Sequence, residues 1–234
     1  MGDAALFRLQ RPSSGNLYLK VAGTAGLPAL RTEAERTRWL SAMGACVPEI
    51  LKAHEKPGTG ALLMTAVPGV HPQNAEQPRE QVIRDLAQGL RKLHALPVAA
   101  CPFDETVAAR LARAQKMIEE GRVEPEQFAE RNTGLTPEAI YRRLLQQTPA
   151  HEDIVVIHGD AKFDNILIDD DGRVGFVDCG HAGKGDRYVD LEAVVSDIEE
   201  HFGQNWIAPF ARFYGEPRLD AKKLRFFGDL YELF

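Results

Sequence analysis

His158-Gly159-Asp160, followed by Asn165 and then by Val177-Asp178-Cys179-Gly180, specifies the architecture of this 234-residue chain. Residues 154–157 (Ile-Val-Val-Ile) are β-branched and predict a buried strand that ends at His158. Residues 165–168 and 174–177 predict two more strands, joined by a tight turn at 169–172 (Asp-Asp-Asp-Gly). The hairpin brings Asn165 and Asp178 close together, with Asp160 on the loop that precedes it.

Two acids and an amide at the ends of neighbouring strands suggest a specific chemistry. Oxygen ligands such as those of Asn165 and Asp178 suit a hard cation, and Mg²⁺ is the natural candidate. A third carboxylate, Asp160, can orient a hydroxyl group. Each element alone is weakly diagnostic, because His-Gly-Asp also occurs as a simple capped turn. Together, in this order and on one hairpin, they predict phosphoryl transfer from a nucleotide.

This pattern resembles the kinase-like fold of the aminoglycoside phosphotransferase and choline kinase superfamily. In that family the H-G-D-x4-N element is the catalytic loop, and the acid after the next strand holds the metal. The resemblance implies Asp160 as the catalytic residue, with Asn165 and Asp178 as Mg²⁺ ligands. It also implies an α+β, bilobal, protein-kinase-like fold. We expect an abbreviated N-lobe with a small antiparallel sheet, a larger and mainly helical C-lobe, and ATP between them.

A lysine in a short apolar strand (residues 18–21) fits the same interpretation. Lys20 on an edge strand would ordinarily face solvent, but a helix predicted at residues 32–43 carries Glu33 shortly afterwards. Kinases pair such a lysine with a helical glutamate and so fix it against the nucleotide phosphates. Glu35 competes for this role. We choose Glu33, whose spacing to Trp39 matches the family pattern, and expect Glu35 to be a solvated surface charge.

The division into lobes follows from where strands give way to helices. A strand at residues 61–65 ends abruptly at Pro68-Gly69, which the resemblance identifies as the hinge between lobes, although a plain strand exit fits these residues equally well. Backbone groups near Thr65 and Val67 would then contact adenine. An amphipathic helix follows at 78–96, with a structural His94 near its end. We expect an N-lobe at 1–67 and a C-lobe at 68–234, with a helical insert at about 104–148.

Composition and charge narrow the function classes. A formal net charge of −6 argues against nucleic acid as the main partner and suits a cationic substrate. No apolar run approaches the ~20 residues that span a bilayer, and no signal peptide is recognisable. Three cysteines far apart in the sequence predict reduced thiols in a cytoplasmic protein. We expect no membrane association, and a monomer or weak dimer.

The resemblance covers nearly the whole chain and is most specific toward the aminoglycoside 3′-phosphotransferases, the kanamycin and neomycin kinases. It extends beyond the generic kinase core in Cys101-Pro102-Phe103, residues 134–137, Asp178-Cys179-Gly180, Asp186-Arg187-Tyr188, Asp190-Leu191 and the aromatic C-terminus. In that subfamily, acids of the helical insert, of a later helix and of the C-terminus hold the substrate's ammonium groups. The matching positions here are Glu130, Asp197, Glu200, Glu232 and the carboxylate of Phe234.

Several departures from the family pattern bear on the range of substrates. Three family acids are replaced by Gln127, Ala129 and Tyr231, and a family arginine by His181. Lys162 is also unusual, and either meets the γ-phosphate or is a solvated loop lysine. These changes narrow the drug range or move the substrate away from aminoglycosides.

The N-terminus departs as well. Residues 1–3 (Met-Gly-Asp) fall almost in the family's nucleotide loop, without the strand that precedes it there, and residues 13–16 predict the following hairpin turn. Either the start is misplaced, or the N-lobe is short and ATP binding weaker.

Three alternatives remain open at this stage. A kinase of the same fold could act on another small hydroxyl compound, such as a sugar or an amino alcohol. The chain could instead be a non-catalytic nucleotide-binding relative of kinases, although the presence of Lys20, Asp160, Asn165 and Asp178 opposes this. Metal-dependent hydrolysis at the His158, Asp160 and Asp178 cluster would explain neither Lys20 nor the hinge. The sequence does not separate ATP from GTP as the donor.

Overall fold

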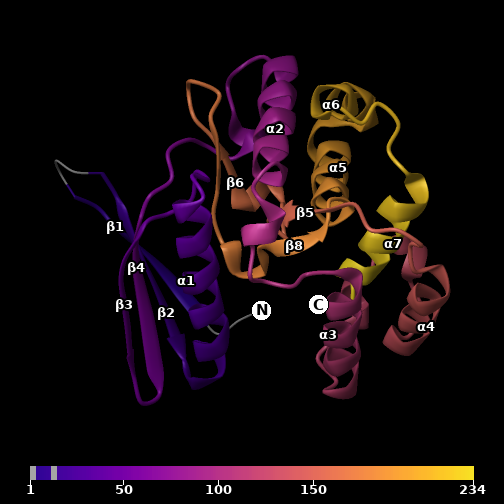
Figure 1. The fold of residues 1–234 in the computed structure, drawn as a ribbon, viewed down its shortest axis with the longest axis horizontal. Helices are drawn as coiled ribbons and strands as arrows, with labels where there is room; N and C mark the ends of the chain where they lie inside the picture. The colour runs from indigo at the N-terminus through magenta and orange to yellow at the C-terminus, as the bar shows by residue number, and fades with distance from the viewer. Residues whose placement is uncertain (1–3, 12–14) are drawn as a thin grey trace.

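The N-terminal part of the molecule is a four-stranded antiparallel sheet with one long helix against it. The computed structural model describes residues 4–11 and 15–234. Its sheet has the order β1-β2-β4-β3, from β1 (Ala4–Leu9), β2 (Leu17–Gly23), β3 (Ile50–Lys56) and β4 (Thr59–Thr65). Helix α1 (Leu27–Ala42) lies beside this sheet in Figure 1. A small core joins helix and sheet, made by Ala22, Leu30, Ala34, Leu62 and Met64.

The start of α1 corrects the sequence prediction. The helix begins at Leu27, five residues before the predicted Thr32, and ends at Ala42. Pro28 stands in its first turn, where the missing N–H of proline costs no hydrogen bond. Leu27 and Leu30 are both buried, so the added turn covers apolar surface of the sheet. Glu33 consequently lies one turn further into the helix than expected.

Strands β1 and β2 lie on either side of residues 13–16, where the sequence predicts a turn. The two strands pair antiparallel, with Leu9 opposite Leu17. Residues 1–3, expected in the nucleotide loop, and residues 12–14 lie outside the described part of the chain.

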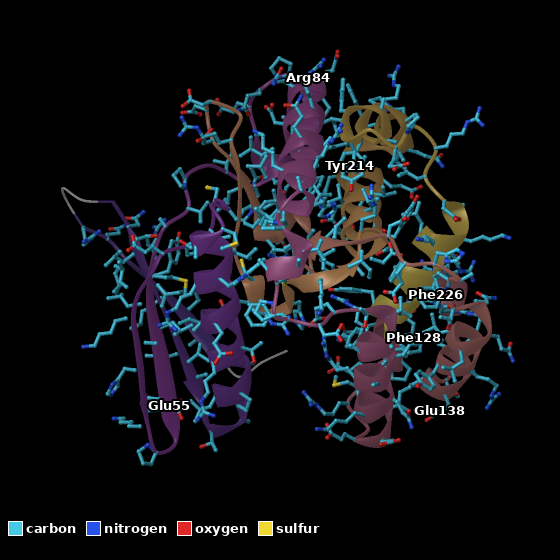
Figure 2. The ribbon with its side chains drawn as sticks, in the orientation of Figure 1. Glu55, Arg84, Phe128, Glu138, Tyr214 and Phe226 are labelled. Atoms are coloured by element: carbon cyan, nitrogen blue, oxygen red, sulfur yellow. The ribbon has the colours of Figure 1, made fainter. Side chains whose placement is uncertain are left out.

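The C-terminal part is mainly helical and has one large core. Its helices are α2 (Arg79–His94), α3 (Val107–Glu119), α4 (Pro137–Gln147), α5 (Tyr188–Phe202), α6 (Ile207–Tyr214) and α7 (Ala221–Tyr231). Figure 1 shows α3, α4 and α7 on the side away from the sheet, and α2 beside α5 and α6. Helix α2 packs on α6 through the buried ring of Tyr214, labelled in Figure 2. The mixed α/β architecture with an antiparallel sheet agrees with the predicted class.

Two short two-stranded sheets carry the functional loops. Strands β6 (Ile166–Ile168) and β7 (Val174–Phe176) pair with Ile166 opposite Phe176, and Gly172 in their turn has φ of +75°. Asp169 accepts the backbone N–H groups of Asp171 and Arg173, so the acidic turn is a capped hairpin, as predicted. The β6–β7 pairing confirms the hairpin that the sequence predicts at residues 165–177.

The other small sheet pairs β5 (Ile154–Ile157) with β8 (Gly183–Asp186). The sequence analysis missed β8, whose Gly-Lys-Gly-Asp sequence has no apolar alternation. A Cβ atom at Gly185 would lie 2.6 Å from the backbone oxygen of Glu105, so only glycine allows this close approach. The glycines of β8 are explained by the backbone near Glu105, which packs directly against the strand. No pattern within residues 183–186 reveals this contact.

Within the described residues, no helix is long and apolar enough to cross a membrane.

Candidate active site

Lys20 of β2 is held between two acids that are far from it in the sequence. Its Nζ lies 2.6 Å from Glu33 Oε2 in α1 and 3.0 Å from Asp178 Oδ1, which follows β7. Burial lowers the pKa of Lys20, but the charges of Glu33 and Asp178 more than offset this and raise it above its usual value. The structure thus joins the predicted Lys20–Glu33 pair and adds Asp178 to it. Glu35 is exposed, as expected.

Asp160 and Asn165 meet on the loop between β5 and β6. The Asn165 side-chain nitrogen donates to the backbone oxygen of Asp160 and to its Oδ2, both at 2.9 Å. This leaves the side-chain oxygen of Asn165 as the atom suited to a cation. A short 3₁₀ turn (Phe163–Asn165) directs Asn165 back toward Asp160. The loop is therefore closed on itself before any ligand binds.

Asp190, a buried acid to which the sequence analysis gave no role at the site, supports this loop. Asp190 of α5 accepts the backbone N–H of His158 at 2.7 Å and that of Gly159 at 2.8 Å. His94 of α2 donates to it from Nε2 at 3.0 Å, which bears out the structural role expected for this histidine. Arg110 of α3 donates to the Gly159 carbonyl at 2.9 Å. Elements from three parts of the C-lobe thus fix the backbone beside Asp160.

Replacing this acid should destabilise the whole protein. We expect Asp190→Ala to lower the free energy of unfolding by about 2–5 kcal/mol, because it leaves the N–H groups of His158 and Gly159 buried without an acceptor. Denaturant unfolding followed by circular dichroism measures this. The matched control is Asp170→Ala, an exposed acid in the β6–β7 turn, which should change stability by less than about 0.5 kcal/mol. Equal stability of the two variants would contradict the supporting role.

The Asp190 carboxylate should also make the free energy of unfolding depend on pH. Burial raises the pKa of Asp190, but hydrogen bonding and charge from His94 and His158 outweigh it and hold the pKa below the usual value. Its stabilisation is therefore complete above the unfolded-state pKa of about 3.9 and disappears as the pH falls through the lower folded-state value. Unfolding curves between about pH 5 and pH 2 should show wild type losing more stability than Asp190→Ala, mainly below about pH 4. Parallel losses would argue against this carboxylate as the source.

A cavity of about 300 Å³ lies between the two parts of the molecule. Apolar side chains line one portion of it, among them Leu6, Tyr18, Met64 and Leu167. Thr65 and Val67 of the predicted hinge line it too, as do Lys20, Glu33, Asn165 and Asp178. The Thr65 backbone N–H donates to the backbone oxygen of Glu49 at 3.0 Å. An apolar slot with a lysine and two oxygen ligands suits a nucleotide with its cation.

Asp178 is suited to a cation by its backbone as well as its charge. Its φ of 56° makes it the one non-glycine residue with positive φ in the described ranges, 4–11 and 15–234. Such left-handed conformations are several-fold enriched in Asp and Asn and recur at functional sites. The Asp178 side chain is 55% exposed, so its second oxygen is open to a ligand. Together with the Asn165 side-chain oxygen, it forms a donor set that fits Mg²⁺.

A second cavity, of about 700 Å³, adjoins the first and shares Leu6, Lys20, Glu33 and Asp178 with it. Glu105, which is fully buried, forms part of its wall and was missed by the sequence analysis. It binds Arg36 of α1 at 2.7 Å and Arg113 of α3 at 2.8 Å. Glu105 therefore ties the helix that carries Glu33 to the helical insert.

The structure does not bring the five predicted substrate residues together around one cavity. None of them is among the described residues that line either cavity. Glu232 is paired with Arg131 at 3.1 Å and accepts from Asn132. Asp197 accepts the backbone N–H of Phe163 at 2.5 Å. Ligand atoms of Asp197, Glu200 and His201 lie within 4.8 Å of one another.

The remaining two positions, Glu130 and Phe234, are exposed. The Phe234 ring lies 6.0 Å from the Arg110 guanidinium and 5.8 Å from that of Arg113. The aromatic C-terminus is thus anchored on α3, whereas Glu130 projects from the insert.

The residues that depart from the family pattern differ in how close they lie to the site. Gln127 is exposed and its side-chain nitrogen donates to Glu124, whereas Ala129 is half-buried. His181 lines the second cavity. Tyr231, by contrast, reaches the loop itself, with its hydroxyl 3.4 Å from Asp160 Oδ1.

A lysine paired with a helical glutamate, an Asp–Asn loop and an acid after the next strand, set between a small sheet lobe and a helical lobe, define a kinase-like phosphotransferase. The chain belongs to the phosphotransferase enzyme family, whose model matches residues 3–227.

Comparison with individual proteins agrees. The aminoglycoside 3′-phosphotransferase of Niallia circulans is 34% identical over 221 residues, covering 93% of this chain and 83% of that protein. The crystal structure of a type VIII aminoglycoside 3′-phosphotransferase superposes with a TM-score of 0.85 at 32% identity, over 100% of this chain and 95% of the other. A Streptomyces rimosus aminoglycoside phosphotransferase in complex with ADP and streptomycin has a TM-score of 0.83 at 28% identity, over 99% and 93%.

Proposed function

We propose that this protein transfers the γ-phosphate of ATP to a hydroxyl of an aminoglycoside antibiotic, the 3′-hydroxyl by analogy with its relatives, and so confers resistance. The observation that carries the proposal is the convergence of Lys20, Glu33 and Asp178 on one cavity, next to the Asp160–Asn165 loop. Relatives that share about a third of the sequence are named for this activity.

In this mechanism each residue has one task. Lys20, oriented by Glu33, contacts the α- and β-phosphates, and residues near Thr65 and Val67 bind adenine. Asn165 and Asp178 hold Mg²⁺, which neutralises charge on the phosphate oxygens when bound. Asp160 accepts a hydrogen bond from the acceptor hydroxyl and takes its proton late, since the transition state is loose. Positioning and electrostatics carry most of the rate.

The division of labour between lobes is part of the proposal. Residues 1–67 bind the nucleotide and residues 68–234 carry the catalytic loop and the acceptor site, with the insert at about 104–148 as one wall. Glu130, Asp197, Glu200, Glu232 and the Phe234 carboxylate bind ammonium groups of the acceptor. Of these, Glu232 must share its charge with Arg131. A cytoplasmic location follows from ATP as donor, and the three cysteines are free thiols.

An ADP-release assay with Mg-ATP and a panel of acceptors tests the proposal. The panel holds kanamycin, neomycin, streptomycin, choline and simple sugars, with no acceptor as the blank. We expect turnover with kanamycin or neomycin, and mass spectrometry of the product should show one added phosphate. Asp160→Asn serves as the inactive control for each acceptor.

Other outcomes point to the alternatives. Turnover with choline or a sugar alone would keep the mechanism but replace the aminoglycoside with another hydroxyl compound. Magnesium-dependent ATP binding without turnover on any acceptor would instead indicate a non-catalytic nucleotide-binding protein.

A further inference from the structure

Both side-chain oxygens of Asp160 already have a polar neighbour in the protein without ligands. Oδ2 accepts from Asn165 at 2.9 Å, and Oδ1 lies 3.4 Å from the hydroxyl of Tyr231. Tyr231 is the last residue of α7, more than seventy positions away from Asp160 in the sequence. In the mechanism proposed above, one of these two oxygens must receive the acceptor hydroxyl. The Tyr231 hydroxyl occupies one of those two positions.

Lys162 lies against the ring of Tyr231. The Lys162 Nζ lies 4.3 Å from the centre of the Tyr231 ring, a cation–π distance. Burial together with the negative charge of Asp160 raises the pKa of Tyr231, so the phenol stays protonated and donates to the carboxylate. Asp160 therefore faces a hydroxyl with an ammonium group beside it, both supplied by the protein itself.

The end of α7 is firmly placed, so this contact is a built feature of the fold. Asp229 is 1% exposed and accepts a hydrogen bond from the Asn132 side chain at 2.9 Å. It also forms ion pairs with Arg131 at 3.1 Å and with Arg143 at 2.9 Å. Glu232, the residue after Tyr231, is paired with Arg131. These ion pairs connect the last turn of α7 to the insert on both sides of Tyr231.

We propose that the Tyr231 hydroxyl stands in for the acceptor hydroxyl on Asp160, and that the acceptor must displace it to react. This inference rests on the proposed function, because it takes Asp160 as the group that receives the acceptor. Tyr231 is a positioning residue in this scheme. It orients the carboxylate and keeps water away from the Asp160 oxygen until a better hydroxyl arrives.

The Tyr231 hydroxyl also limits the hydrolysis of ATP by water. Without acceptor, a water molecule bound at Asp160 can attack the γ-phosphorus, forming a new P–O bond while the bond to the β,γ-bridging oxygen breaks. ADP leaves, phosphate is released, and the proton of the water passes through Asp160 to solvent. A tyrosine hydroxyl at Oδ1 excludes that water. Because the acceptor must displace this hydroxyl, Tyr231 also weakens acceptor binding.

Tyr231→Phe tests this with little change of shape. Loss of one hydrogen bond to a charged group corresponds to about 10-fold, so ATP hydrolysis without acceptor should rise by roughly 3- to 10-fold. The KM for the acceptor should fall by a similar factor, while kcat for transfer changes less. Tyr141→Phe is the matched control, since the Tyr141 hydroxyl donates to Gln115 at 3.2 Å on the surface of the insert. It should leave both quantities unchanged.

Two further measurements separate the possible failures. Asp160→Asn in the Tyr231→Phe background should abolish the gain in hydrolysis, which assigns the gain to the carboxylate. Unchanged hydrolysis and unchanged acceptor KM in Tyr231→Phe, or a lower kcat with neither of those changes, would overturn the inference. If no aminoglycoside is phosphorylated, the proposed function fails, yet the hydrolysis comparison still decides the role of Tyr231.

Discussion

Asp160→Asn should reduce kcat for phosphate transfer by about 10²–10⁴-fold while the Kd for ATP stays within about twofold. The substitution keeps the shape of the side chain and an oxygen that can accept from Asn165, whose bond to Asp160 is 2.9 Å long. It removes the negative charge that attracts the proton of the acceptor hydroxyl. Since Asp160 is not among the residues that line the cavity of about 300 Å³ proposed for the nucleotide, nucleotide binding should persist.

The measurement combines steady-state kinetics with nucleotide titration. Asp171→Asn, an exposed acid in the β6–β7 turn, is the matched control and should behave as wild type. If Asp160→Asn retains turnover within a factor of ten, Asp160 is not the group that receives the acceptor. If ATP binding is lost as well, the loop has collapsed, and thermal unfolding of the variant will show it.

Asp178→Asn should weaken binding of Mg-ATP by at least on the order of 10²-fold, because even partners outside the first ligand shell of a metal are worth 10–100-fold. Binding of ATP without Mg²⁺ should not weaken, since one negative charge near the phosphates is removed. Asparagine is the right replacement because it tolerates the left-handed φ of 56°, whereas alanine would add backbone strain. Lys20 keeps Glu33 as its partner in the variant.

Calorimetric titration with ATP, with and without Mg²⁺, separates these effects. Wild type should show a large gain on adding Mg²⁺, and Asp178→Asn little or none. The same titration on Asp171→Asn controls for a general change of surface charge. An undiminished Mg²⁺ effect in Asp178→Asn would mean that the cation is held elsewhere and would remove Asp178 from the metal site.

Local patterns in the sequence were sufficient for the hairpin that carries the site. Strand β5, the β6–β7 turn and helix α2 were predicted within one or two residues, because β-branched runs, turn chemistry and an apolar helical face are all short-range signals. The pairing of Lys20 with Glu33 required the family pattern in addition. Spacing along the chain alone does not tell Glu33 from Glu35.

The misses share one cause, which is that long-range packing leaves no local signal. Strand β8 is rich in glycine because Glu105 passes against it, and nothing in its own four residues predicts a strand. The sequence analysis assigned no role to Asp190 or Glu105, yet each is buried at a junction of separate elements. Buried acids of this kind are recognised only once their donors are brought together in space.

The acceptor side illustrates the same limit. Matching positions in the family suggested carboxylates that hold ammonium groups of the substrate. In the structure Glu232 is paired with Arg131, and Asp197 accepts the backbone N–H of Phe163. The replacement of an acid by Tyr231 was visible in the sequence as a departure. Its contact with Asp160 at 3.4 Å was not visible, because it depends on how the end of α7 is anchored.

By itself, the sequence determined the chemistry available to this protein: a lysine, two acids and an amide, with the strands and turn that carry them. These features depend on neighbouring residues, whose backbone preferences and apolar spacing act over a few positions. Only the tertiary structure decided which of these groups meet, what supports the loop that holds Asp160 and Asn165, and which side chain contacts Asp160. Those outcomes depend on contacts between residues as distant as Asp160 and Tyr231, and such contacts form only when the whole core packs.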